Sequence, residues 1–249
     1  MEPVRSPRNT RVARAVRLHR AGERAQSGLT LLEGPHLLAE AVQAGVEPIE
    51  VFGLESDEDS RSLVPADRWI SVTQEVLDRL APTESPRGPI AVVPIPDDGS
   101  VTRDSVTIGT TDPGNAGTLI RSAAAFGLDV VKSEVSVDLW SPKVLRAGAG
   151  AHYRTTIGRL QHRAGLIATV VEGGMPAEAM DLERDRPWSI LVGSEAHGLT
   201  AAAIRSADRL VTIPMVGGTE SLNAGVAGSI LAYELRRWRN AAGAWRASR

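Results

Sequence analysis

From residue 105 onward, short apolar runs rich in β-branched residues alternate with stretches of helical periodicity. Such alternation is typical of strand–helix–strand units, which build a mostly parallel sheet covered by helices. We therefore predict an α/β fold, and we expect any ligand to bind in the loops after the strands, because the carboxyl ends of parallel strands share one edge. The predicted strands are residues 106–111, 129–131, 167–171, 189–192 and 210–213, and helices are predicted to end near residues 126, 147 and 238.

The N-terminal part of the chain predicts a smaller α/β domain. Residues 29–53 predict a strand, a turn, a helix and a second strand, and residues 69–80 predict a strand followed by a helix. Residues 94–104 combine turn-forming residues with charge and lack periodicity, so they predict a linker. The expected organisation is a domain over 1–95, a linker over 96–104 and a second domain over 105–249.

Composition excludes several classes of site. The 249 residues contain no cysteine, so disulfides, thiolate nucleophiles and cysteine-based metal centres are impossible, and the five histidines lack the spacing of a zinc-binding helix. We expect no metal. No run of about 18 apolar residues is present, and no apolar signal core follows the N-terminal arginines. The sequence therefore predicts a cytoplasmic protein without a membrane span.

The first 24 residues form a basic arm. They contain seven arginines against only Glu2 and Glu23, although the formal net charge of the chain is −2. Clustered cations bind polyanions whatever the total charge, so the arm is a candidate contact for the backbone phosphates of a nucleic acid. A solvated, partly disordered segment would have the same composition, and charge alone leaves both interpretations open. The candidate nucleic-acid contacts in the arm are Arg8, Arg11, Arg17 and Arg24.

The common nucleotide-binding signatures are missing. The sequence has no GxGxxG motif, neither of its two lysines follows a glycine as a phosphate-binding loop requires, and no GxSxG motif is present. A nucleotide-like cofactor would therefore have to be bound in another way.

The segment TDPGNAGTLIRSAAAFG, residues 111–127, follows the first predicted strand of the second domain. Asp112-Pro113-Gly114 leaves the strand, and Asn115 lies near the cap of the helix that begins there. Arg121 falls roughly opposite the apolar face of this helix, and Gly117 one turn earlier leaves its base uncrowded. The guanidinium can project toward a ligand above the strand ends, or Arg121 is simply a surface arginine.

Two further segments follow predicted strands. SILVGSEAHGLT, residues 189–200, places Glu195 between Gly193 and Gly198, where a carboxylate can accept hydrogen bonds and the backbone can approach a ligand closely. In residues 210–239, a glycine-rich loop precedes Ser221 and Asn223, which open a helix of small and apolar residues. Ser221 taken alone is more simply explained as a helix cap.

The three segments together closely resemble the SpoU (TrmH-like) family of RNA ribose methyltransferases over residues 104–239. The matching stretches are DPGNAGTLIRSAAAFG, VGSEAHGL and IPMVGGTESLNAGVAGSILAYE, in the family's order. Residues 137–154 also resemble family sequence and would place Lys143 and Arg146 near the site as RNA contacts. Residues 29–93 resemble, less closely, the ribosomal-protein-like RNA-binding domain that many members carry, although Arg87 stands where the family more often has Gln.

This resemblance implies the SPOUT fold, in which the C-terminal segment of the α/β sheet is threaded into a deep trefoil knot. It also implies a homodimer that binds S-adenosylmethionine in the knot. The cofactor would contact the backbone around three residues, which explains why the loops are rich in small residues. The implied cofactor-binding residues are Gly193, Ile213 and Leu222, with Ser194, Met215 and Gly218 beside them.

The implied reaction is methyl transfer to a ribose 2′-hydroxyl. Arg121 matches the arginine that the family proposes for activating this hydroxyl. Because a guanidinium is a poor proton acceptor, we expect it to bind the flanking phosphate and stabilise the developing alkoxide. The resemblance implies that further side chains orient Arg121, the ribose and the loops. These are Asn115, Glu195, Ser221 and Asn223.

The RNA target is less constrained than the reaction. An N-terminal RNA-binding domain is typical of members that act on large-subunit (23S) ribosomal RNA, which we therefore expect as substrate. Some relatives of this shape confer resistance to thiopeptide antibiotics, and that role stays open. The alternatives are a tRNA ribose methyltransferase, a knotted enzyme that methylates a ring nitrogen, and a non-catalytic RNA-binding member of the fold.

Overall fold

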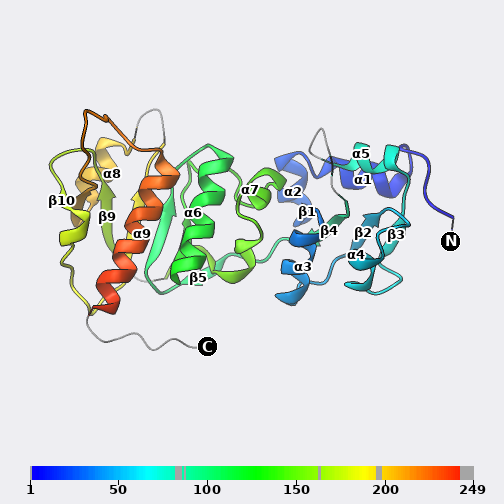
Figure 1. Cartoon of the computed structure of the whole chain (residues 1–249), viewed down its shortest axis with the longest axis horizontal. Helices are drawn as coiled ribbons and strands as arrows, with labels where there is room; N and C mark the ends of the chain where they lie inside the picture. The colour runs from blue at the N-terminus through cyan, green and yellow to red at the C-terminus, as the bar shows by residue number, and fades with distance from the viewer. Residues whose placement is uncertain (1, 82–85, 87, 162–163, 195–197, 242–249) are drawn as a thin grey trace. The chain divides into compact units, whose positions relative to one another are not determined.

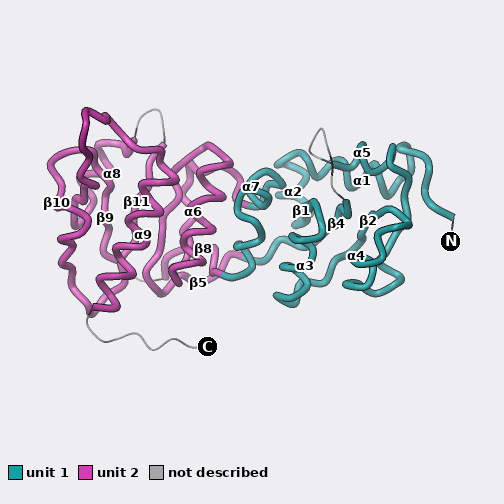
Figure 2. The backbone as a smooth tube through the Cα atoms, in the orientation of Figure 1, with its two compact units in different colours: residues 1–97, 140–154 teal, residues 98–139, 155–249 magenta. Residues whose placement is uncertain are grey.

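The computed structural model describes residues 2–81, 86, 88–161, 164–194 and 198–241. The chain forms two compact units, which Figure 2 distinguishes by colour. The first unit comprises Met1–Asp97 with Trp140–Arg154, and the second comprises Asp98–Leu139 with Thr155–Arg249. No helix among the described residues is both long and apolar enough to cross a lipid bilayer.

The first unit is built on a four-stranded sheet in the order β1-β4-β2-β3. Strand β4 is antiparallel to both β1 and β2, whereas β2 and β3 are parallel. Residues from the sheet and from its helices form one core, which includes Val12, Leu31, Phe52 and Leu77. The strands are β1 (Leu29–Glu33), β2 (Glu50–Gly53), β3 (Trp69–Ser71) and β4 (Ile90–Pro94), and the helices are α1 (Thr10–Arg17), α2 (Ala21–Ser27), α3 (Pro35–Gln43), α4 (Glu58–Ser62) and α5 (Gln74–Leu80).

The basic arm is folded. Asn9 caps α1 by accepting a hydrogen bond from Arg11 N at 2.9 Å, and one face of the helix places Val12 and Ala15 in the core. The arginines of α1 occupy its remaining faces, so α1 is an amphipathic helix, and a short turn leads from it into α2. The interpretation as a partly disordered segment is therefore wrong for the described residues of the arm.

Residues 140–154 belong to the first unit, although the sequence placed them in the second domain. They form α7 (Pro142–Ala147) and the 3₁₀ helix η1 (Ala151–Arg154). The hydroxyl of Thr30 on β1 donates a 2.7 Å hydrogen bond to the carbonyl oxygen of Trp140, and Arg146 pairs with Glu33 at 3.2 Å. These contacts explain the difference, because they hold the segment against β1.

The second unit contains an eight-stranded sheet in the order β10-β12-β9-β11-β6-β7-β8-β5, and all of its strand pairs are parallel. The α/β class and the large parallel sheet are thus confirmed, while the trefoil knot stays a prediction. The strands are β5 (Gly99–Val101), β6 (Ser105–Ile108), β7 (Asp129–Lys132), β8 (Ile157–Leu160), β9 (Gly165–Thr169), β10 (Met175–Pro176), β11 (Trp188–Val192) and β12 (Arg209–Thr212). The helices are α6 (Pro113–Phe126), α8 (Ala201–Ser206), α9 (Ala224–Asn240) and the 3₁₀ helix η2 (Ala177–Ala179).

Helices α6 and α9 pack side by side over the sheet (Figure 1). Ser122 of α6 and Ser229 of α9 share a 2.7 Å hydrogen bond, and four residues further along each helix the rings of Phe126 and Tyr233 meet edge-on. The two helices therefore run in the same direction. A Cβ atom at Gly228 would overlap the side chain of Leu119, so glycine at this position allows the helices to approach closely.

Candidate active site

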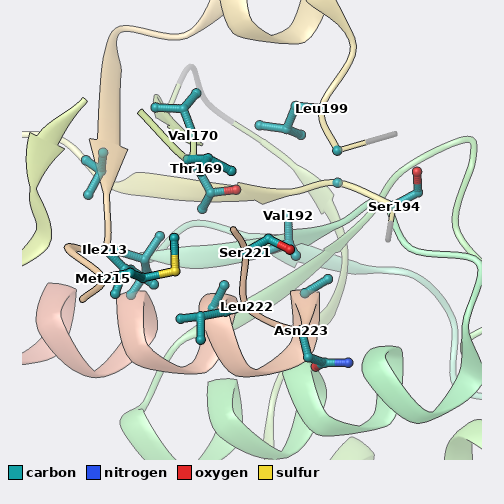
Figure 3. A pocket seen from close by; sticks show the side chains of 17 residues that line it. Thr169, Val170, Val192, Ser194, Leu199, Ile213, Met215, Ser221, Leu222 and Asn223 are labelled. Carbon is teal, nitrogen blue, oxygen red and sulfur yellow. The ribbon is translucent and has the colours of Figure 1, made fainter. Parts of the chain in front are cut away.

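A cavity of about 440 Å³ lies at the carboxyl ends of β9, β11 and β12, beside the first turns of α9 (Figure 3). In Figure 3, Val170 and Leu199 lie on one side of the cavity, and Met215 and Leu222 lie on the opposite side. This position agrees with the expectation that a ligand binds at the carboxyl edge of a parallel sheet. The lining residues are Thr169, Val170, Val171, Val192, Gly193, Ser194, Gly198, Leu199, Val211, Ile213, Met215, Ser221, Leu222, Asn223, Ala224, Ala227 and Leu231.

The loop after β11 forms one wall of the cavity. Ser194 and Gly198 exchange two backbone hydrogen bonds, of 3.2 and 2.8 Å, which bring the two ends of the loop together. A Cβ atom at Gly193 would overlap the backbone of Gly198 and lie 2.5 Å from the amide nitrogen of Leu199. Only glycine therefore fits at position 193 without moving the backbone, and the cavity wall there is peptide rather than side chain.

The loop after β12 and the start of α9 form the facing wall. Asn223 caps α9 by accepting a hydrogen bond from Val226 N at 3.1 Å, and the helix begins at Ala224. The helix therefore starts three residues later than the sequence predicted. Ser221 lies before the cap, so its explanation as a helix cap is wrong, and it lines the cavity instead.

Most of the predicted cofactor-binding residues lie around this cavity. Five of the six line it, and Gly218 does not. Gly218 instead lies in the loop after β12 with a positive φ of 74°, where glycine is favoured for conformational reasons. The five lining residues are Gly193, Ser194, Ile213, Met215 and Leu222.

Two predicted catalytic residues meet at the N-terminal ends of α6 and α9. Asp112 caps α6, and its side chain accepts a 2.7 Å hydrogen bond from the backbone N–H of Asn115. Asn115 is buried, with 8% of its surface exposed. A Cβ atom at Gly225 would lie 2.9 Å from Asn115 Oδ1 and 3.2 Å from Asn223 Oδ1. The two asparagine side chains therefore flank Gly225, and Asn223 also lines the cavity.

Arg121 lies away from the cavity within a single chain. It is exposed on α6, on the same stripe as Thr118 and Ala125, and no residue of α6, all of which the structure describes, lines the cavity. Glu195, the remaining predicted catalytic residue, lies outside the described residues. The structure thus gathers Ser221 and Asn223 at the cavity and Asn115 beside it, but not Arg121.

The end of β9 is the part of the cavity that sequence reasoning missed. Thr169, Val170 and Val171 line the cavity, yet none was a candidate. The available signal was their position at the end of a predicted strand, which makes them part of the ligand-binding edge. The signal was overlooked because these residues are small or apolar and carry no reactive group.

The candidate RNA contacts occupy different environments. Arg11 pairs with Glu50 at 2.8 Å, whereas Arg8 is exposed. Arg24 is only 4% exposed and donates a 2.6 Å hydrogen bond to the carbonyl oxygen of Leu18, so it cannot present its charge to a ligand and its expected role needs correction. In α7, Lys143 and Arg146 are exposed residues, and Arg146 pairs with Glu33 as described above.

His19 predicts a pH dependence of stability. Its Nε2 lies 3.0 Å from the carbonyl oxygen of Leu80. Burial lowers the pKa of His19, and the positive charges of Arg24 and Arg79 lower it further. The hydrogen bond to Leu80 and the negative charge of Glu33 raise the pKa, but by less. As the pH falls, His19 takes up a proton in the unfolded chain at a higher pH than in the folded chain. The stability that neutral His19 contributes is therefore fully present above about pH 6.5 and is lost as the pH falls through the folded-state pKa. We expect thermal unfolding, followed by circular dichroism, to shift less between about pH 7.5 and 5.5 in His19→Asn than in the unaltered protein. Equal shifts would contradict this assignment.

Two family profiles match the chain. The SpoU rRNA Methylase family matches residues 106–233, and the MRM3-like substrate binding domain matches residues 9–91. The 23S rRNA (guanosine(2553)-2'-O)-methyltransferase RlmP of Bacillus subtilis is 28% identical and aligns over 95% of this chain and 100% of its own. A Synechocystis protein named as an uncharacterized tRNA/rRNA methyltransferase is 32% identical and aligns over 94% of this chain and 93% of its own.

A solved structure shares the whole fold. The SpoU methyltransferase AviRb from Streptomyces viridochromogenes, in complex with AdoMet, has a TM-score of 0.82 and 26% identity, and the match covers 93% of this chain and 98% of that one. The parallel sheet, the cavity at its strand ends and these likenesses define an RNA methyltransferase. The chain belongs to the SpoU rRNA methylase family.

Proposed function

We propose that this chain transfers a methyl group from S-adenosylmethionine to a ribose 2′-hydroxyl of large-subunit ribosomal RNA. The observation that carries the proposal is the cavity at the ends of β9, β11 and β12, where two of the family's three motifs meet. The B. subtilis relative, which aligns over its full length, is named as a 23S rRNA 2'-O-methyltransferase, and AviRb was crystallised with AdoMet. A cytoplasmic location stays a prediction.

The cavity has a lining that suits S-adenosylmethionine. Its volume of about 440 Å³ lies within the range of about 300–1,000 Å³ that is usual for small-molecule sites. Leu199, Met215 and Leu222 offer apolar surface to an adenine ring, while the peptide groups around Gly193 and the hydroxyl of Ser221 offer hydrogen-bonding partners. The bound cofactor would supply an electrophilic methyl group.

The protein's own contribution is to position the ribose and stabilise charge. The 2′-oxygen must be held in line with the methyl carbon, forming a bond to it as the carbon–sulfur bond breaks and the hydroxyl proton leaves. Since a guanidinium stays protonated, Arg121 binds the phosphate beside the target ribose and stabilises negative charge developing on the oxygen. The proton leaves through that phosphate or through water. Asn115, Ser221 and Asn223 orient these groups, and Glu195 has the same predicted role.

A homodimer accounts for the position of Arg121. Within one chain, this residue is exposed and does not line the cavity, and a second copy could supply Arg121 to it. Val226 and Tyr233 on the neighbouring helix α9 are 45% and 51% exposed, and apolar residues exposed together on a helix favour an interface. An interface through α6 and α9, related by two-fold symmetry, would bring each Arg121 toward its partner's cavity.

Methylation of defined RNA tests the proposal. The purified chain is incubated with labelled S-adenosylmethionine and a 23S rRNA transcript, with a tRNA transcript as the comparison. We expect a labelled nucleotide in 23S rRNA whose 3′ phosphodiester bond has become resistant to alkaline cleavage. The bond is resistant because a methylated 2′-oxygen cannot attack the adjacent phosphate. Label in tRNA alone would replace the proposed substrate, label without alkali resistance would indicate base methylation, and RNA binding without label would indicate a non-catalytic protein.

A further inference from the structure

A second cavity, of about 600 Å³, lies in the first unit and is bordered by three arginines. They come from separate elements: Arg17 from the last turn of α1, Arg20 from the turn before α2, and Arg79 from the last turn of α5. All three residues are exposed. The complete lining is Pro7, Ala13, Val16, Arg17, His19, Arg20 and Arg79.

The charges around this cavity are not balanced by ion pairs with the residues that the structure describes. Arg11 and Arg14, on another face of α1, share Glu50 at 2.8 Å each. By contrast, no carboxylate in the described part of the chain forms an ion pair with Arg17, Arg20 or Arg79. Three like charges around one hollow repel one another, and a bound anion would remove that repulsion.

Helix electrostatics explain only part of this arrangement. Basic side chains in the last turn of a helix are stabilised by its carbonyl groups, which accounts for Arg17 and Arg79. Arg20, however, is the N-cap of α2, where a cation is disfavoured, and it makes no side-chain capping hydrogen bond. Local structure therefore gives no reason for arginine at position 20, whereas an anion in the cavity does.

His19 lines the same cavity, and the positive charge of neighbouring arginines acts on its ring. The charges of Arg24 and Arg79 act together with burial to lower its pKa. Because a carbonyl oxygen can only accept, Nε2 donates its hydrogen to Leu80 O and the ring is held in place at 3.0 Å. Val16 and Pro7 add apolar surface beside the cations, which strengthens their attraction for an anion by excluding water.

We propose that this cavity binds the backbone phosphates of the substrate RNA through Arg17, Arg20 and Arg79. The inference rests on the proposed function, which makes RNA the substrate. It names a surface that binds parts of the RNA other than the nucleotide that is methylated. A guanidinium fork matches two oxygens of a phosphodiester, and such contacts position RNA without selecting its sequence. The match of residues 9–91 to a substrate binding domain supports RNA as the occupant.

The test removes the three charges together. Arg17→Gln, Arg20→Gln and Arg79→Gln are combined in the full chain, and binding to a 23S rRNA transcript is measured by fluorescence anisotropy over a range of salt concentrations. Each phosphate contact contributes about 0.7 to 0.9 to the slope of log affinity against log salt, the smaller value for single strands. We expect the slope to fall by about 1 or more and the affinity in about 0.1 M salt to weaken about tenfold or more.

A matched variant controls for total charge. Arg5→Gln, Arg61→Gln and Arg68→Gln remove the same charge from exposed positions outside the cavity and should change the slope less. Equal binding by the two triple variants would overturn the inference. Inorganic phosphate, compared with chloride at equal ionic strength, should displace RNA from the unaltered protein more than from the cavity variant. If the cavity variant no longer responds to inorganic phosphate but binds RNA as tightly as the unaltered protein, the cavity binds free anions and not RNA. That result would also overturn the inference.

Two further measurements separate this inference from the proposed function. S-adenosylmethionine binding should be the same in both triple variants and the unaltered protein, because the cofactor cavity lies in the second unit. At saturating 23S rRNA, methyl transfer by the cavity variant should recover. If the unaltered protein binds 23S rRNA but fails to methylate it, the proposed function fails, whereas the salt slopes still decide what the cavity binds.

Discussion

Gly193→Ala should weaken binding of S-adenosylmethionine by about 5- to 150-fold. The added methyl group would overlap the backbone of Gly198 and approach Leu199 N to 2.5 Å, and backbone cannot rotate away as a side chain can. Forcing a group into a packed region costs about 1–3 kcal/mol, and that range sets the expected loss. Because Gly193 lines the cavity, the loop that moves is also the proposed wall of the cofactor site. Titration calorimetry with S-adenosylmethionine measures the effect directly.

Gly22→Ala is the matched control for this substitution. Gly22 lies in α2, where an added Cβ atom would meet nothing within 4 Å, so the same change should leave cofactor binding unaltered. Thermal unfolding without cofactor shows whether Gly193→Ala keeps the fold, and the added shift with cofactor reports binding. Unchanged affinity in a folded Gly193→Ala protein would remove this loop from the cofactor site.

The sequence predicted the central strands of the second unit but not its outer ones. The runs SILV and LVTI, residues 189–192 and 210–213, are mostly apolar and β-branched, and they correspond to β11 and β12. Strands β5 and β10 have three and two residues and leave no pattern, and β8 contains glycine and arginine in IGRL. The stretch predicted as a linker therefore contains β5, which pairs with β8. Val101 is paired with Leu160, and 58 residues of sequence separate the two.

The site was predictable as loops but not as an arrangement. Gly193 and Ser221 could be singled out because glycine and polar residues interrupt an apolar pattern after a strand. That these loops face one another depends on β9 lying between β11 and β12, and strand order is a long-range property that local patterns do not contain. For the same reason the sequence could not show that Arg121 lies outside the cavity, or that residues 140–154 pack on the first unit.

Arg121→Ala should lower the rate of methyl transfer by about 100- to 1,000-fold and leave cofactor affinity unchanged. Removing one group that stabilises developing negative charge typically has an effect of this size, and Arg121 does not line the cofactor cavity. Arg121→Lys keeps the charge but loses the planar fork, so we expect it to be at least about tenfold slower. Single-turnover methylation of 23S rRNA gives the rates, and Arg159→Ala, which removes an 84%-exposed side chain from the same unit, is the control. Near-normal turnover by Arg121→Lys would contradict the role of the fork.

If the chain forms the proposed homodimer, mixed dimers decide which chain supplies Arg121 to a given cavity. If the arginine acts on the partner's cavity, a dimer of one Arg121→Ala chain and one Gly193→Ala chain has one site with both defects and one site with none. Co-expression of the two variants forms such dimers about half the time, so about a quarter of the unaltered activity should return at a cofactor concentration that fills only the unaltered cavity. If Arg121 serves the cavity of its own chain, every site in the mixed dimer carries one defect, and the mixture should be no more active than the two variants assayed apart.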